Sequence, residues 1–252
     1  MITAIILYCL PPPESGYRLN QILTKTQYDP DRGGYNLSLV RDWRRRAPAR
    51  LPLHVHTTLE ASIEGFLDTI EKIDKEYPIR NLRWTLIHLD QITPSQIERM
   101  KKLGMYTAMH TRPTIMGGIF NEIHGERSYS MPPLKMVQDS GITWGFGTDT
   151  TVVNQFRPFT TLYWVVTGKM VGGTQVLRQT ISREDALTAH TRKNAYFHFQ
   201  ENNLGSIQPG KLADLVVLDR DYLTVPADQI KDIKPTMTMV GGKIVYDAAE
   251  AR

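Results

Sequence analysis

The sequence has a single cysteine, Cys9, in 252 residues. One thiol cannot form a disulfide within the chain, and a zinc site built on cysteines is excluded as well. Stability must therefore come from a packed core, for which the chain is long enough, either as one large domain or as two small ones. Because disulfides are characteristic of secreted proteins, their absence leads us to expect a cytoplasmic location.

Long hydrophobic runs are also missing. The apolar stretch "MITAIILYCL" at residues 1–10 has about nine apolar residues, whereas a membrane-spanning helix needs about 20. It lacks the basic segment and the small-residue cleavage site of a signal peptide. We therefore expect a buried strand at this position and no membrane partner.

The excess of basic residues is small, with a formal net charge of +4. Much of it comes from one run, "RDWRRRAPAR" at residues 41–50, which we interpret as the solvated end of a helix leading into a strand. A nucleic-acid interface would require basic residues spread over a face, with aromatic residues or a known binding fold. The sequence shows neither, so we expect no nucleic-acid partner.

From residue 50 onward, short apolar runs typical of buried strands alternate with amphipathic helical segments. Strands are predicted at residues 51–56, 81–89, 105–110 and 142–149, and helices at 59–77, 93–104, 157–170 and 182–199. A long loop rich in glycine and polar residues is predicted after His110, followed by a short helix ending near Gly141. Strands that alternate with helices predict an α/β fold with a parallel sheet and right-handed crossovers.

The pattern changes after Asn203. Turn residues precede a β-rich run within residues 205–221, and two further β-prone segments flank Gly241-Gly242. Two strand-like segments around a glycine pair are typical of a hairpin. We therefore expect the last ~50 residues to form a small β appendage on the α/β part.

Four polar side chains fall at the carboxyl ends of predicted strands: His56, His88, His110 and Asp149. Parallel strands bring these ends to one edge, where the active sites of α/β barrels form. Histidines with a carboxylate suit a divalent metal, and zinc is the first candidate. The alternative is that strand ends tolerate polar residues because loops begin there.

Other polar residues have a functional and a structural interpretation. Asp149 follows "GFGT" and either ligates a metal and acts as general base for a water, or caps the next helix. His124 and Arg127, in the predicted loop, either contact substrate or are solvated. His54 lies on the same face as His56 but deeper, and we interpret it, like His190, as structural.

Several stretches together resemble the metal-dependent amidohydrolases, in particular the branch of N-substituted formamide deformylase. The most specific is "GSIQPGKLADLVVLDRDYLTVPADQIKDI" at residues 205–233. The other stretches that resemble the family, over residues 50–247, are "LHVH", "LIHLDQITP", "SGITWGFGTD", "DALTAHTRKNAYF" and "TMVGGKIVYD".

The resemblance implies a partial TIM (β/α) barrel, about strands 4–8, over residues 1–203, followed by part of a small β-sandwich at 204–252. His54-Val55-His56 imitates the metal-binding HxH pair on strand 1 of the family. The interval from His56 to Asp149 is nevertheless too short for a full barrel, which takes about 200–250 residues. We therefore assign "LPLHVH" to strand 5, so that His56 alone would be a ligand.

By this resemblance, His56, His88 and Asp149 would hold a divalent metal, with zinc expected, and Asp149 would be the general base. His110, His124 and Arg127 would bind the substrate, a small-molecule amide or formamide whose non-peptide carbon–nitrogen bond is hydrolysed.

The sequence also departs from the family pattern. No histidine precedes His54, the only lysine before residue 50 is Lys25, and "HTTLE" follows the strand 5 segment where the family has "HAIGD". The chain thus resembles the C-terminal half of an amidohydrolase. Because an open half-barrel exposes sheet edges, we expect a homo-oligomer or a second chain that completes it. A truncated, inactive fragment or an interaction module is the alternative function.

Overall fold

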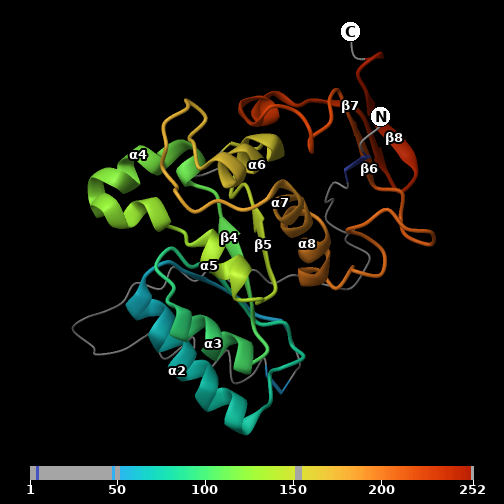
Figure 1. The fold of residues 1–252 in the computed structure, drawn as a ribbon. Helices are drawn as coiled ribbons and strands as arrows, with labels where there is room; N and C mark the ends of the chain where they lie inside the picture. Colours follow the sequence, from blue (N-terminus) through green and yellow to red (C-terminus); the bar gives the residue numbers. More distant parts are fainter. Residues whose placement is uncertain (1–3, 6–46, 49–51, 151–154, 251–252) are drawn as a thin grey trace. The chain divides into compact units, whose positions relative to one another are not determined.

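The computed structural model describes residues 4–5, 47–48, 52–150 and 155–250 (Figure 1). The chain forms two compact units, of which one comprises residues 16–110 and 131–144 and the other residues 1–15, 111–130 and 145–252. Cys9, Lys25 and nearly all of the basic run at 41–50 lie outside the described residues. The predicted division into residues 1–203 and 204–252 stays a prediction.

A parallel sheet forms the centre of the first unit. Its described strands are β2 (His54–Thr57), β3 (Thr85–His88) and β4 (Tyr106–His110), paired side by side in that order. Beyond β4, the Thr107 N–H donates to the carbonyl of Thr143 at 3.2 Å, at the start of β5 (Trp144–Gly147). The four predicted strands are therefore confirmed, and the pairing of β2, β3 and β4 is parallel as predicted.

Two helices connect these strands and lie side by side in Figure 1: α2 (Glu60–Glu76) and α3 (Pro94–Lys102). One face of α2 is buried because apolar residues recur at helical spacing; these are Ile63, Phe66, Leu67, Ile70 and Ile73. Arg99 of α3 reaches α2, where its guanidinium bonds Glu71 at 2.7 Å and Asp68 at 2.6 Å. The two helices are thus held together by charge where their exposed faces meet.

Local sequence sets the start and end of α3. Thr93 and Gln96 form the predicted capping box, since each side chain bonds the other residue's backbone N–H. Pro94 occupies the first turn, where a missing N–H costs nothing. Gly104 follows the helix with a φ of +67°, and a Cβ there would lie 2.8 Å from the carbonyl oxygen of Arg80. A glycine is therefore required at this end.

The second unit contains an antiparallel sheet in the order β1-β6-β7-β8. Its strands are β1 (Ala4–Ile5), β6 (Leu215–Leu218), β7 (Pro235–Val240) and β8 (Lys243–Asp247). Gly241 and Gly242 both have positive φ, as the tight turn of the predicted hairpin requires. A two-residue strand at Ala4–Ile5 and the C-terminal β segments are thus present, while the predicted burial of the N-terminal strand stays a prediction.

The loop predicted after His110 is wrong in part. The segment contains a helix, α4 (Pro113–His124), and a 3₁₀ helix, η3 (Gly125–Ser130), before the short α5 (Leu134–Asp139). The glycine and polar content predicted a loop, but Gly117 is buried inside α4. A Cβ at Gly117 would lie 2.7 Å from the side chain of Val176.

The long helix predicted at residues 182–199 is two helices. They are α7 (Arg183–His190) and α8 (Arg192–Phe197), and they divide at Thr191, whose φ of −119° and ψ of −82° are not helical. The Ser182 cap is confirmed, because its hydroxyl accepts from the Asp185 N–H at 3.0 Å. The preceding helix, α6 (Pro158–Thr167), packs against the 3₁₀ helix η4 (Ala227–Asp232).

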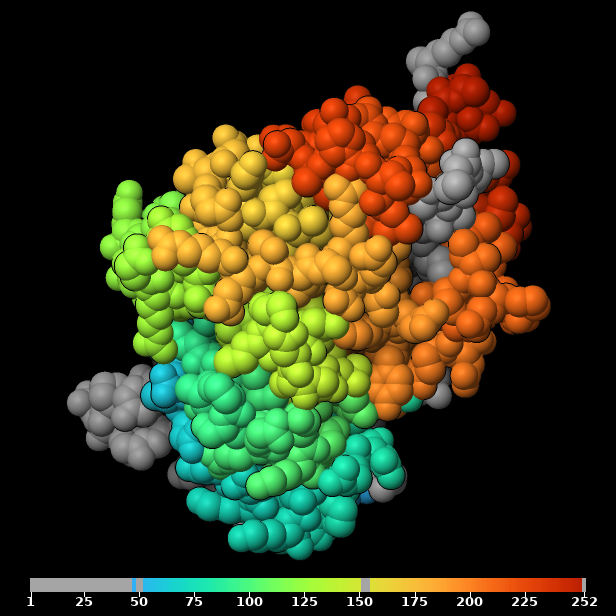
Figure 2. Space-filling model, viewed as in Figure 1, coloured from blue at the N-terminus to red at the C-terminus, as the bar shows by residue number. Residues whose placement is uncertain are grey.

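The surface of α4 carries three exposed isoleucines, Ile115, Ile119 and Ile123, and Figure 2 shows this segment, in light green, at the surface.

Within the described part of the chain, no helix has both the length and the apolar character needed to cross a membrane.

Replacement of the two glycines of α4 tests its packing. Gly117→Ala should destabilise the protein by about 1–3 kcal/mol, because the added methyl group meets the stiff side chain of Val176. Gly118→Ala is the matched control: its nearest neighbour is the Met170 sulfur at 4.0 Å, so it should be neutral or stabilise by up to about 1 kcal/mol. Urea unfolding of both variants measures the difference, and equal effects would contradict this packing.

Candidate metal-binding site

Two histidines face the same side of the parallel sheet because of strand register. His56 of β2 pairs with Ile87, and Ile87 pairs with Ala108 of β4. Residues paired in this way share a face, and His110 lies two positions beyond Ala108, so it shares that face too. Alternation alone therefore places His56 and His110 together at the carboxyl edge of the sheet, and His54 lies on the same face.

His88 reaches this face in a different way. In the register of β3, it pairs with Thr57 and Met109, so regular alternation would turn it to the opposite face. Its φ is +80° and that of Leu89 is +53°. The left-handed backbone ends the strand and redirects the side chain, so that the His88 ring lies 4.2 Å from the His56 ring and 5.1 Å from the His110 ring, between centroids.

Two consecutive non-glycine residues in the left-handed region are costly, at about 1–2 kcal/mol each. Backbone bonds hold the turn: the Leu89 N–H donates to Thr57 O at 2.9 Å, and the Gln91 N–H donates to Thr58 O at 3.0 Å. Strain of this kind persists where the surroundings over-determine it, and it concentrates at functional sites. The turn at His88-Leu89 therefore marks this edge of the sheet as a candidate site.

A buried carboxylate lies in the same cluster. Asp90 forms a short hydrogen bond with Nε2 of His110, and the two side chains are 7% and 1% exposed. Asp90 is not among the site residues predicted from the sequence. The available signal was a carboxylate two residues after a strand-end histidine, which is the kind of partner that orients an imidazole.

The other predicted site residues belong to the second unit. Asp149 follows β5, is exposed and has a φ of +51°. His124 is the last residue of α4, and its ring lies 6.0 Å from that of Phe120. Arg127 is exposed in η3. Thus His124 and Arg127 lie on helical elements rather than in the predicted loop.

Over residues 52–150 and 155–250, no group of three or more histidine, cysteine, aspartate or glutamate side chains is arranged to hold a metal ion. The first unit does bring together His56, His88 and His110. The ligand set of His56, His88 and Asp149 stays a prediction.

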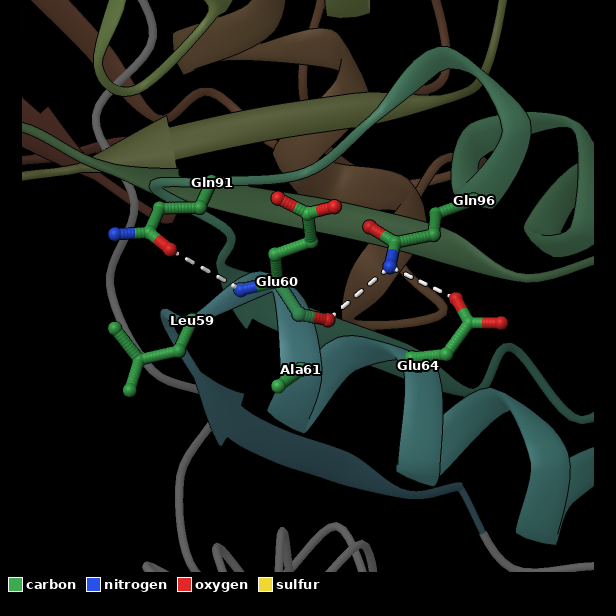
Figure 3. A pocket seen from close by; sticks show the side chains of 6 residues that line it. All are labelled: Leu59, Glu60, Ala61, Glu64, Gln91 and Gln96. Atoms are coloured by element: carbon green, nitrogen blue, oxygen red, sulfur yellow. Dashed lines mark hydrogen bonds between the residues drawn. The ribbon is translucent and has the colours of Figure 1, made fainter. Parts of the chain in front are cut away.

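A cavity of about 470 Å³ lies beside the starts of α2 and α3 and is lined by Leu59, Glu60, Ala61, Glu64, Gln91 and Gln96 (Figure 3). Gln91 Oε1 accepts from the Glu60 N–H, while Gln96 Nε2 donates to the Glu60 carbonyl and to the Glu64 carboxylate. These bonds fix the cavity wall. The residues follow β2 and β3 directly, and the volume is that of a small-molecule site.

His190 is a buried histidine of the second unit. Its ring packs edge-on against Phe146 at 5.0 Å between centroids, and Nε2 is buried with no hydrogen-bond partner among the described residues. Burial lowers the pKa of His190 from 6.5 to about 4. A neutral ring packed on an aromatic side chain agrees with the structural interpretation of this residue.

Comparison with known proteins gives a consistent family. A model described as the amidohydrolase family matches residues 43–246. The chain is 23% identical to N-substituted formamide deformylase of Arthrobacter pascens over 218 residues, which are 84% of this chain and 40% of that protein. It is 24% identical to protein LONG AFTER FAR-RED 3 of Arabidopsis thaliana over 204 residues, 78% of this chain and 34% of that one. The chain thus spans less than half the length of these relatives.

Solved structures show the same fold. An uncharacterized metal-dependent hydrolase of Pyrococcus furiosus has a TM-score of 0.60 and 23% identity, over 74% of this chain and 37% of its own. An atrazine chlorohydrolase of Arthrobacter aurescens, solved with zinc, has a TM-score of 0.59 and 18% identity, over 84% of this chain and 48% of its own. The α/β fold with a parallel sheet is therefore confirmed, while the half-barrel and the sandwich stay predictions.

The low pKa of His190 predicts a pH dependence. Because the unfolded chain binds this proton more readily than the folded chain, stability should fall as the pH drops from 6.5 toward 4. His190→Phe keeps a ring against Phe146 but cannot titrate. Between about pH 7.5 and pH 5, the free energy of unfolding of this variant should therefore fall by about 2 kcal/mol less than that of the unchanged protein. Urea unfolding at both pH values measures this, and equal losses in the two proteins would contradict the buried, neutral ring.

Proposed function

Because the chain belongs to the amidohydrolase family, we propose that it is a metal-dependent hydrolase of an amide or formamide carbon–nitrogen bond. The observation that carries the proposal is the pairing of the His56 and His88 rings at the carboxyl ends of adjacent parallel strands. The similarity to a formamide deformylase supports this bond class. Since the relatives are more than twice as long, the activity of the whole protein is part of the proposal.

The donor set fits a divalent metal ion. His88 is buried and His56 half-buried, and neutral imidazole nitrogens are ligands that zinc prefers. By the family resemblance, Asp149, an exposed carboxylate after β5, is proposed as the further ligand. When bound, the ion would acidify a water molecule and polarise the substrate carbonyl.

The side chains of the chain supply the proton transfers and the orientation. Asp149 takes a proton from the attacking water and gives it to the departing amine, the role of a general base that becomes a general acid. We propose that His124 and Arg127 bind the substrate, with His110 facing the reacting end. The cavity beside α2 and α3 lies within the first unit, and its volume suits a small ligand.

A second candidate is an inactive fragment or interaction module. It is favoured by the absence of any three-ligand group among the described residues and of an HxH pair before His54 in the sequence. Such a module would keep the fold but would not hydrolyse any substrate. Under either function, we propose a second copy or a completing chain as the partner of the open sheet.

Metal content separates the two candidates at the level of binding. The purified chain should carry zinc near one equivalent, and the double variant His56→Ala, His88→Ala should lose it, because both imidazole donors are removed. His198→Ala, a histidine beyond α8, is the control and should keep the metal. Plasma mass spectrometry measures the content. A chain that carries no metal, or equal metal in all three proteins, would favour the inactive module.

The role of Asp149 predicts a loss of turnover without a loss of fold. Asp149→Asn keeps the size of the side chain but removes the base, so hydrolysis of an N-substituted formamide should fall by about 10²–10⁴-fold. The amine product is measured over time, beside the thermal midpoint of each protein. Turnover that is unchanged in the variant would exclude Asp149 as the base.

A further inference from the structure

We propose that Asp90 and His110 form a positioning pair that holds the left-handed turn at His88-Leu89 and fixes the His88 ring against His56. The structural part stands on the first unit alone. The functional part of the proposal, that the pair presents His88 to a metal ion, rests on the proposed function. Neither residue is required to touch the metal.

His88 needs such a device because strand geometry works against its position. Regular alternation would direct it away from His56, and only the left-handed backbone brings the two rings to 4.2 Å. On the side of β2, the turn is held by the two backbone bonds from Leu89 and Gln91. On the side of β4, the Asp90 carboxylate accepts from Nε2 of His110. The turn is thus held from both neighbouring strands.

The bond between Asp90 and His110 is well suited to this task. Both side chains are almost wholly buried, so water does not compete for the donor and acceptor. The His110 ring is in turn 5.1 Å from the His88 ring. Removing the acceptor would take this buried bond away from His110, whose ring lies beside that of His88.

A metal ion gives this order its importance. Ligands must be held within about 0.5 Å of the productive geometry by neighbours whose own rotamers are locked. Carboxylate partners behind histidines serve this purpose at many metal sites. Here the carboxylate acts one ring further away, through His110 and onto His88. This assigns to His110 the positioning of a metal ligand, in addition to the substrate contact proposed above.

The experiment compares two replacements of Asp90. Asp90→Asn keeps an oxygen that can accept from His110, whereas Asp90→Leu has the same shape without an acceptor. Asp214→Leu is the matched control, because Asp214 is 5% exposed, belongs to the second unit and accepts from the Gly241 N–H at 2.7 Å. The ring signals of His88 are recorded by NMR in metal-free, histidine-labelled chain, and zinc affinity is then measured with a competing dye.

The proposal expects Asp90→Leu to shift and broaden the His88 ring signals and to weaken zinc binding by about 10–100-fold. Asp90→Asn should restore most of both, and Asp214→Leu should change neither, whatever it costs in stability. His110→Phe keeps a ring but removes the donor. It should give the same shift of the His88 signals and the same loss of zinc affinity, and it replaces Asp90→Leu as the test if that variant does not fold. Unchanged His88 signals in Asp90→Leu or in His110→Phe would overturn the proposal.

The two levels of inference fail separately. If the unchanged chain binds no zinc, the proposed function fails, while the metal-free ring signals still decide whether Asp90 and His110 position His88. If zinc binds with normal affinity in every variant, the metal site stands and the positioning pair is wrong.

Discussion

The candidate site depends on one constraint, the left-handed backbone at His88 and Leu89. Parallel pairing of β2, β3 and β4 brings three strand ends to one edge, but register alone gives His56 and His110 a common face and turns His88 away. The turn corrects this at a conformational cost, which backbone bonds to the carbonyl of Thr57, at the end of β2, and to that of Thr58, just after it, must offset. The strand ends of the sheet thus determine where the site lies, and the strained turn adds His88 to the residues that face it.

Much of this arrangement could be predicted from the sequence. Period-3.6 apolar spacing indicated α2, the capping box and Gly104 set the limits of α3, and the glycine pair indicated the β7–β8 hairpin. These signals are local, so a single chain carries them. The placement of histidines at strand ends was equally readable, because it needs only the strand boundaries.

The rest depends on contacts between distant segments. The glycine content of α4 disfavours a helix, so α4 was not predicted. Gly117 is required there because the side chain of Val176, a residue far along the chain, leaves no room for a Cβ. The break at Thr191 interrupts a continuous helical pattern. No rule of alternation predicts the positive φ at His88 or the bond between Asp90 and His110. Sequence patterns predict regular helices and strands but not departures from them. In this chain, one such departure, the turn at His88-Leu89, lies at the candidate site.

The central claim is that His56 and His88 together ligate a divalent metal ion in an amidohydrolase fold. X-ray absorption at the zinc edge of the zinc-loaded chain tests it most directly, because it counts imidazole ligands without requiring a substrate. The account predicts at least two imidazole nitrogens at about 2.0–2.1 Å from the ion, and fewer after His88→Ala. A spectrum with water and carboxylate oxygens alone, unchanged in that variant, would contradict it.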